Sequence, residues 1–165
     1  MSKLGIFKLY NDVEDVSYGT EQSSCFDLRA YLRDSAKLFN TKNEEYIVEG
    51  YERVVLRPGC RALMPTGMIF DIPKGYSIRI HPRSGLAVKH GITLINGEGI
   101  VDSDYVNQIF VALHNTSTNP YAIAHGDRIA QAEIIEEVQC TFEYLTFAPG
   151  VKTDRTGGFG HTGTA

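Results

Sequence analysis

The chain has 165 residues and a mass of 18.3 kDa, which fits one domain with a full hydrophobic core. Hydrophobic residues make up 42% and charged residues 22%, a balance that excludes a chain disordered throughout. The formal net charge is −4, so the molecule as a whole is a poor match for nucleic acid or an anionic membrane. A polyanionic ligand would therefore need a local cluster of cations.

Targeting segments and metal-binding motifs are not evident. No apolar run reaches the length that spans a bilayer, and the first residues lack the apolar stretch of a secretory signal, so we expect a cytoplasmic protein. Cys25, Cys60 and Cys140 are widely spaced and predict free thiols in a reducing compartment. The five histidines lack HxxxH or HxH spacing, which argues against a zinc or iron site built from protein ligands.

Short strands are expected along most of the chain, because β-branched and aromatic residues recur in short, partly alternating runs. The clearest strands are predicted at 53–56, 67–72, 76–80 and 109–113. Residues 128–138 alternate like a strand, although their glutamate-rich end also suits a helix. Many short strands without a long helical pattern indicate an all-β barrel or jelly roll.

Turns and polar stretches separate these strands. Pro58-Gly59 predicts a type II turn, and Ile72 to Gly75 predicts a type I turn that joins two strands as a hairpin. Residues 34–49 are polar and charged, and we interpret them as an inert surface excursion rather than a partner-binding insert. Residues 151–165 contain four glycines, with Phe159 as their one large apolar residue, and predict a mobile tail.

Five segments concentrate residues that can carry chemistry. In the first, residues 25–30, Asp27 lies among apolar residues, a pattern that by itself is typical of a surface acid on a strand. In the second, residues 82–87, Arg83, Ser84 and Gly85 offer a guanidinium, a hydroxyl and accessible backbone N–H groups to phosphate oxygens. The alternative is an ordinary turn that opens a helix and leaves Arg83 solvated.

The third segment, residues 96–105, begins with the turn signal Asn96-Gly97. Asp102 and Asp104 follow, and on an extended chain they would face one side. Paired acids near a phosphate-binding segment suggest metal or water activation, while the alternative is an acidic loop that binds nothing.

The last two segments are weaker when taken alone. In residues 126–131, Asp127 and Arg128 suit pairing with each other or with neighbours. In residues 154–163, Arg155 and the glycines would fold over a triphosphate while Phe159 stacks on a base, or the segment is a disordered terminus.

Taken together and in this order, the five segments resemble the five motifs of the trimeric dUTPases. The matching stretches, DLRA, PRSGLA, N-x-x-G-x-x-D-S-D-Y, GDRIAQ and R…GGFGHTG, lie between residues 25 and 163. The resemblance implies a jelly-roll-like β-barrel subunit at 1–151, a glycine-rich lid at 152–165 and a homotrimer with shared active sites. It further implies hydrolysis of dUTP to dUMP and pyrophosphate, with Mg²⁺ on the triphosphate. This reaction limits uracil in DNA and supplies dUMP for thymidylate synthesis.

The resemblance also implies roles for individual residues. Asp102 would activate the water that attacks the α-phosphorus, and Tyr105 would pack beneath the deoxyribose. Asp27 would reach Mg²⁺ through water. The remaining substrate-binding residues would hold uracil (Asn96, Gly99, Ile100, Val101), the phosphates (Arg83, Ser84, Gly85, Gln131) or the closed lid (Arg155, Phe159, Gly160, His161, Thr162).

The chain departs from the family pattern in a tail that is one residue short after Arg155 and in Asn107, where a glycine usually stands. Three other readings compete with a dUTPase. A dCTP deaminase shares the fold, but the Asp102-to-Tyr105 run and the glycine-rich tail argue against it. A non-catalytic nucleotide-binding trimer conflicts with the presence of Asp102 and Arg155. A purely structural β-protein leaves all five motifs to chance.

Overall fold

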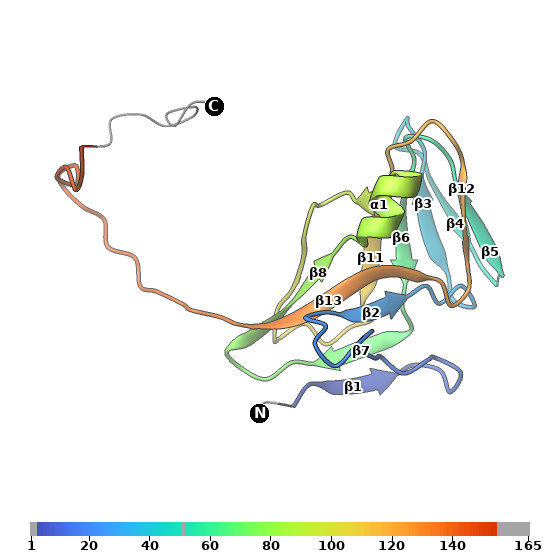
Figure 1. The fold of residues 1–165 in the computed structure, drawn as a ribbon, viewed down its shortest axis with the longest axis horizontal. Helices are drawn as coiled ribbons and strands as arrows, with labels where there is room; N and C mark the ends of the chain where they lie inside the picture. Colours follow the sequence, from blue (N-terminus) through green and yellow to red (C-terminus); the bar gives the residue numbers. More distant parts are fainter. Residues whose placement is uncertain (1–2, 51, 155–165) are drawn as a thin grey trace.

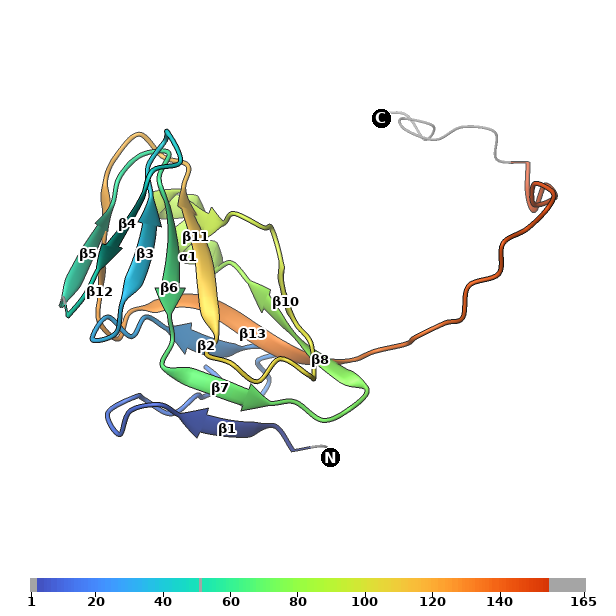
Figure 2. The same ribbon diagram turned by 180° about the vertical axis from the view of Figure 1, so that it is seen from behind.

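A computed structural model describes residues 3–50 and 52–154, and Figures 1 and 2 show it from two sides. In chain order its elements are β1 (Gly5–Lys8), β2 (Phe26–Arg29), β3 (Ala36–Phe39), β4 (Glu45–Val48), β5 (Arg53–Leu56), β6 (Arg61–Pro65), β7 (Met68–Asp71), β8 (Tyr76–His81), α1 (Ser84–His90), β9 (Ile92–Leu94), β10 (Gly99–Val101), β11 (Phe110–Asn115), β12 (Tyr121–Ala124) and β13 (Arg128–Glu136). The expectation of a β-rich subunit is confirmed, since the described residues contain a single seven-residue helix.

Two larger antiparallel sheets form the body of the subunit. One has the strand order β10-β8-β13-β2 and the other β4-β3-β6-β11-β9, while β1 pairs with β7 and β12 pairs with β5. Neighbours within a sheet are far apart in sequence, as where β13 lies between β8 and β2 (Figure 1). Residues from opposite ends of the chain therefore share one sheet face.

The core explains which side chains remain available for function. In β2, Phe26 and Leu28 are buried, and the alternating Asp27 and Arg29 are only half-buried, because successive residues of a strand point to opposite faces. The buried set also includes Ile78, Ile80, Ala130 and Ala132 of the four-stranded sheet and Leu38, Met64, Val111 and Leu113 of the five-stranded sheet. Burying one large aliphatic side chain contributes about 1.5–3 kcal/mol to the free energy of folding. Because this stabilisation comes from the inward-facing side chains, the outer face of the four-stranded sheet can carry charged residues without weakening the core.

The predicted strands are present, and the ambiguous segment 128–138 is a strand. β13 pairs with β8 on one side and with β2 on the other, so it is a central strand. The Pro58-Gly59 turn is also confirmed: Gly59 has φ +70°, and the Cys60 N–H donates to the Arg57 carbonyl at 3.0 Å.

The turn after β7 differs from the prediction in register and in role. The Tyr76 N–H donates to the Pro73 carbonyl at 3.1 Å, which places Gly75 third in the turn with φ +88°. Glycine adopts this angle without the penalty of a side chain, so the turn starts one residue later than predicted and has type II character. The predicted hairpin is wrong, because β7 pairs with β1 whereas β8 pairs with β10 and β13.

Residues 34–49 are part of the fold rather than a surface excursion. They contain the antiparallel pair β3–β4, and β3 also pairs with β6. Ala36 and Leu38 are buried, while Lys37 between them is exposed. The prediction was wrong because charged residues on the outer face hid a short period-two pattern.

Beyond β13 the chain leaves the body as an extended arm, residues 137–154 (Figures 1 and 2). The arm exposes apolar side chains, with Phe142 at 86% and Tyr144 at 96% of their full exposure. The predicted domain boundary at residue 151 falls within the arm, and the glycine-rich end from residue 155 onward lies outside the described residues. Among the described helices, none is long and apolar enough to cross a membrane.

Candidate functional site

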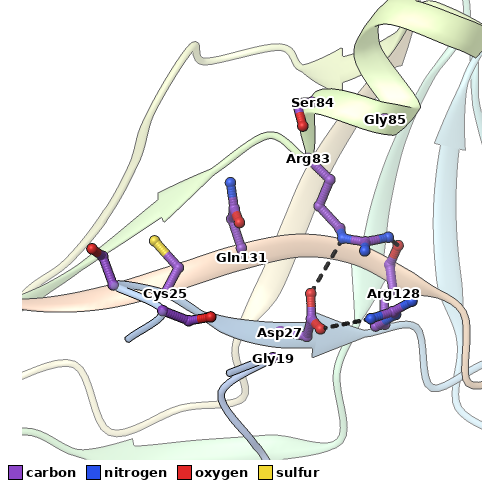
Figure 3. A pocket seen from close by; sticks show the side chains of 10 residues that line it. Gly19, Cys25, Asp27, Arg83, Ser84, Gly85, Arg128 and Gln131 are labelled. Carbon is purple, nitrogen blue, oxygen red and sulfur yellow. Dashed lines mark hydrogen bonds and ion pairs between the residues drawn. The ribbon is translucent and has the colours of Figure 1, made fainter. Parts of the chain in front are cut away.

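A polar pocket of about 380 Å³ lies between β2, β13 and the start of α1 (Figure 3). We call it the Asp27 pocket. It combines the first, second and fourth sequence segments with part of the loop before β2, and its lining residues are Gly19, Ser23, Ser24, Cys25, Asp27, Arg83, Ser84, Gly85, Arg128 and Gln131. Four residues predicted to bind phosphate and the one predicted to serve Mg²⁺ thus share one cavity.

Asp27 is held between two guanidinium groups. Its Oδ1 lies 3.2 Å from Arg83 Nε, and its Oδ2 lies 3.2 Å from Arg128 Nη1. Arg83 also donates through Nη1 to the Arg128 carbonyl at 3.1 Å. Two guanidiniums against one carboxylate leave one net positive charge, and this is the local cation cluster that an acidic protein needs to bind a polyanion.

The backbone places these groups by register. Gln131 lies opposite Asp27 in the β13–β2 pair, and the register shifts between Arg128 and Ala130. Such an irregularity turns a strand locally and re-aims its side chains, which here accompanies the approach of Arg128 to Asp27. Gln131 Nε2 donates to the Pro82 carbonyl at 3.1 Å and so ties β13 to the segment before α1.

The second segment combines both readings of its sequence. It does open a helix, because α1 begins at Ser84, but Arg83 is bound to Asp27 rather than freely solvated. Gly85 faces open space: a Cβ built on it would meet no neighbouring heavy atom within 4 Å. Within this chain, the backbone at Gly85 is therefore accessible to a ligand.

A second cavity, of about 300 Å³, has a different character. We call it the Asp102 pocket, and its lining residues are Leu63, Ile100, Val101, Asp102, Tyr105, Ile109 and Phe110. Asp102 is the single charged residue in a lining that is otherwise apolar apart from the Tyr105 hydroxyl. The pocket thus presents one exposed carboxylate beside surfaces suited to a flat, weakly polar group.

Residues 102–105 form a turn rather than an extended chain. The Tyr105 N–H donates to the Asp102 carbonyl at 3.1 Å, and the Tyr105 hydroxyl donates to the Gln108 carbonyl at 3.0 Å. The expectation that Asp102 and Asp104 face one side of a strand therefore fails. The turn instead brings Tyr105 into the same cavity as Asp102.

Asn96 and Gly99 lie at the connection between the two main sheets. β9 pairs with β11, whereas β10 pairs with β8, so this turn joins two sheets and does not close a hairpin. Gly99 packs closely on β8, since a Cβ on it would lie 3.1 Å from Ile80 Cβ and 3.6 Å from Asn96 Nδ2. A larger residue at 99 would press β10 away from β8.

The two pockets lie at opposite edges of the four-stranded sheet. β2 carries Asp27 at one edge, β10 leads into Asp102 at the other, and β8 and β13 lie between them. With strands spaced about 4.8 Å apart, three intervals separate the edges by roughly 14 Å. One chain therefore does not bring the predicted site residues together, and the predicted lid residues Arg155, Phe159, Gly160, His161 and Thr162 lie outside the described residues.

Sequence reasoning missed part of the Asp27 pocket. Arg128 was expected to pair locally but binds Asp27, while Asp127 Oδ2 accepts the Ala124 N–H at 2.8 Å. The sequence did hold a signal for the contact between Arg128 and Asp27. The two residues lie in the fourth and first matched motifs, which the resemblance assigns to one active site.

Cys25 was also missed as a lining residue. Burial, with a smaller contribution from the Glu133 carboxylate, raises the pKa of its thiol. Cys25 is therefore a neutral thiol near pH 7, which argues against a nucleophilic thiolate in this pocket.

Comparison with known proteins agrees with this architecture. The dUTPase family model matches residues 46–163. The chain is 44% identical over 147 residues to the deoxyuridine 5'-triphosphate nucleotidohydrolase of Finegoldia magna, covering 88% of this chain and 89% of that protein. A dUTPase variant of Staphylococcus bacteriophage 80alpha, solved with dUpNHpp, has the same fold, with a TM-score of 0.78, 18% identity and coverage of 99% and 100%.

A second structural neighbour has the same fold. The dUTPase variant from phage phi11 of S. aureus aligns with a TM-score of 0.69 and 17% identity over 88% of this chain and 98% of that one, and its structure contains a structural Mg(II) ion. At this identity the likeness concerns the fold alone. With a family model over most of its length and a relative 44% identical over nearly all of it, the chain belongs to the dUTPase family.

Proposed function

We propose that the protein hydrolyses dUTP to dUMP and pyrophosphate in active sites assembled from different copies of the chain. One copy would contribute the Asp27 pocket and another the Asp102 pocket. The separation of the two pockets across the four-stranded sheet is the observation that carries this proposal. Family membership supplies the reaction.

The Asp27 pocket suits the triphosphate. Arg83 and Arg128 present guanidinium groups, whose planar donors match phosphate oxygens, and Ser84, Gly85 and Gln131 add hydroxyl, backbone and amide donors. Stabilising the charge that spreads over phosphate oxygens is the main task in phosphoryl transfer. A pocket with a net positive charge would supply this stabilisation.

Asp102 suits the role of general base. Its exposed carboxylate stands against an apolar wall, where it accepts a proton from a water held on its solvent side. The water oxygen then bonds to the α-phosphorus, and the bond from that phosphorus to the bridging oxygen breaks, so pyrophosphate leaves. A carboxylate fixed in this position also orients the water toward the phosphorus, which is why the reaction would need Asp102.

The rest of the Asp102 pocket suits the nucleoside. Tyr105 would offer a flat surface to the deoxyribose and exclude an added 2′-hydroxyl, and Ile100 and Val101 line the same cavity. Asn96 and the backbone from Gly99 to Val101 supply donors and acceptors for the uracil edge. Close packing of Gly99 on Ile80 keeps this backbone in place.

The residues of the Asp27 pocket fit Mg²⁺ that arrives on the nucleotide. Asp27 is its one carboxylate and is already shared by two arginines, so the described pocket offers no all-protein cage. Mg²⁺ usually keeps several waters and binds substrate phosphates, which leaves Asp27 to contact it through water. The ion supplies further neutralisation of phosphate charge when it is bound.

The arm at residues 137–154 supports assembly into a homotrimer. Its exposed apolar side chains, Phe142, Tyr144 and Phe147 among them, need a partner surface, and a second copy of the chain provides one. The tail from residue 152 would continue from this arm as the lid over the phosphates. We further propose that the enzyme acts in the cytoplasm on free nucleotide.

Mixed trimers test the shared site. Arg83→Ala and Asp102→Asn proteins should each lose most turnover, but trimers reconstituted from an equal mixture should recover about one quarter of wild-type turnover. Three in four random trimers are mixed, and each mixed trimer holds one intact site in three under cyclic symmetry. Mixing Asp102→Asn with Asp102→Ala is the matched control and should restore nothing.

Failure of the first mixture to regain activity, with mixed trimers verified by native mass spectrometry, would show that one chain supplies both pockets. Substrate identity is tested in parallel by pyrophosphate release from dUTP, dCTP, dTTP and UTP, each with and without Mg²⁺. Turnover of dUTP alone is the expected result, and ammonia release from dCTP would contradict it.

A further inference from the structure

Three potential metal ligands converge on the outer face of the four-stranded sheet. Cys25 immediately precedes β2, His81 ends β8, and Glu133 lies within β13. One ligand atom from each, the thiol sulfur, an imidazole nitrogen and a carboxylate oxygen, lies within 4.8 Å of the other two. All three side chains are half-buried, so they are neither loose surface groups nor part of the core.

Sheet register explains this convergence. Gln131 is paired with His81 and Ala132 with Phe26, so Glu133 follows on the same face as Gln131 and lies beside Cys25. The three residues are distant in sequence, which is why histidine spacing along the chain did not indicate a site. The pairing of β13 with both neighbouring strands brings them together.

The distances suit a single ion. His81 Nε2 lies 3.0 Å from Glu133 Oε1, and tetrahedral coordination at Zn–N and Zn–O distances near 2.0–2.2 Å and Zn–S near 2.3 Å separates ligand atoms by roughly 3.3–3.8 Å. Small side-chain rotations therefore bring all three atoms onto one ion. The ion would replace the hydrogen bond between His81 and Glu133, and the Cys25 thiol would release its proton to solvent and bind as a thiolate.

A metal-bound histidine usually has a carboxylate beside its other ring nitrogen, and Glu98 lies in this position next to His81. Glu98 Oε1 lies 3.6 Å from His81 Nδ1, on the ring nitrogen that does not face Glu133. Glu98 is in turn near Arg79 Nη1, at 3.8 Å from its Oε2. A carboxylate on the remote nitrogen orients the ring and raises its basicity toward a metal on the other nitrogen.

We propose that Cys25, His81 and Glu133 form a binding site for Zn²⁺ or a similar transition-metal ion, with water as the fourth ligand. The mixed sulfur, nitrogen and oxygen donors favour such an ion over Mg²⁺, which prefers oxygen donors alone. The proposed ion is therefore different from the nucleotide-bound Mg²⁺ of the proposed reaction and does not require it, although the two sites adjoin, since Cys25 also lines the Asp27 pocket. Because Cys25 and Asp27 are two residues apart on an extended strand, the ion would add positive charge roughly 7 Å from Asp27.

Co²⁺ titration of metal-free, full-length protein tests the site directly. We expect one Co²⁺ per chain, a near-ultraviolet thiolate-to-cobalt charge-transfer band, strong visible bands of tetrahedral cobalt, and loss of all of these on adding Zn²⁺. No nucleotide is present, so the result does not depend on the proposed hydrolase activity.

Matched cysteine variants separate this site from adventitious thiol binding. Cys25→Ser should abolish the charge-transfer band, while Cys140→Ser, which alters an exposed cysteine on the arm, should leave it unchanged. Glu98→Gln keeps all three ligands and should weaken Co²⁺ binding by about 10–100-fold. Each variant must keep the wild-type oligomeric mass and melting temperature, so that a lost band reports a lost ligand and not a misfolded protein.

Three results would overturn the proposal. They are tetrahedral cobalt bands absent from wild-type protein, a charge-transfer band that persists in Cys25→Ser, and a band that disappears in Cys140→Ser. Unchanged Co²⁺ affinity in Glu98→Gln would count against the orienting role of Glu98. Because this variant keeps all three ligands, it remains a usable test if Cys25→Ser is unstable.

Discussion

The Asp27 and Asp102 pockets belong to one sheet yet provide opposite environments. The first holds two guanidiniums and a carboxylate among hydroxyls and amides, whereas the second sets one carboxylate against apolar walls. Phosphates and a nucleoside require these two environments, and a single chain places them at opposite sheet edges. Under the proposed function, the contrast means that each pocket is half of a site, which assembly rather than folding would complete.

The substitution Asp102→Asn is the strongest test of the proposed division of labour between the two pockets. The amide has nearly the same shape but cannot take a proton from water, and general-base catalysis contributes about 10²–10⁴-fold. We expect kcat for dUTP to fall by this amount while nucleotide affinity stays near wild type. Steady-state kinetics with calorimetric binding measure both, and an unchanged kcat would remove Asp102 from the role.

Truncation before Lys152 tests whether the two pockets suffice without the tail. The truncated protein should keep its oligomeric mass but lose most turnover, with kcat affected more than nucleotide binding, because lid closure excludes water from the reacting groups. Light scattering and dUTP turnover give the two readouts. Full activity would contradict the lid, and dissociation into single chains would assign the tail to assembly.

Arg128→Ala should damage the phosphate half alone. A hydrogen bond to a charged group is worth about 1.5–3 kcal/mol, so kcat/KM should fall roughly 10–150-fold. Preference for dUTP over UTP should stay as in wild type, because Arg128 lines the Asp27 pocket, whereas the proposed sugar site is the Asp102 pocket. Arg128→Lys is the control and should recover part of the loss, since it keeps the charge without the planar fork.

Tyr105→Ala should do the reverse and damage selection of the nucleoside. Removing the ring opens space beside the sugar, so the ratio of kcat/KM for dUTP to that for UTP should fall, by at most about 100-fold for an apolar surface that rejects a hydroxyl. Tyr105→Phe keeps the ring and serves as the matched variant. A ratio equal to wild type in the alanine variant would place the sugar elsewhere.

Tyr31→Phe, remote from both pockets, should change stability and not catalysis. The Tyr31 hydroxyl donates to Asp12 Oδ1 at 2.7 Å, and burial, followed by the Asp12 contact, raises the pKa of Tyr31 to about 12. A raised folded-state pKa stabilises the protein below the ordinary tyrosine pKa near 10 and loses this effect as pH approaches 12.

Wild-type protein should therefore lose stability between about pH 10 and 12 more steeply than Tyr31→Phe, as denaturant melts at several pH values would record. Near pH 8 the variant should be less stable by about 0.5–1.5 kcal/mol, the net worth of an ordinary hydrogen bond, because Asp12 is exposed and water screens its charge. A fall in kcat at that pH would show that this contact supports the site.

Local patterns in the sequence predicted much of the fold but little of its pairing. The alternation of Ala130 and Ala132 was enough to favour a strand, and Pro58-Gly59 was enough for a turn. The buried pair Ala36 and Leu38 was overlooked because two residues carry a weak signal against charged neighbours. The false hairpin at Gly75 arose because a turn does not determine which strands pair, since that depends on contacts distant in sequence.

The same limit applied to the site. Motif resemblance assigned Asp27 to Mg²⁺ and Arg83 and Gln131 to the phosphates, and the fold places all three in one cavity. The pairing of Arg128 with Asp27 and the approach of Cys25 to Glu133 follow from β13 lying against β2, which no local pattern records. The roles of the predicted residues in binding and catalysis stay predictions until the variants are measured.

The exposed arm at residues 137–154 has a consequence for how the protein survives dilution. An isolated chain leaves Phe142, Tyr144 and Phe147 in water, and covering them in the proposed assembly links subunit association to the free energy of unfolding. Melting temperature should then rise with protein concentration, and very dilute enzyme should lose activity over time through dissociation. Abundance in the cell would thus set both the amount of enzyme and the fraction of it that holds a complete site.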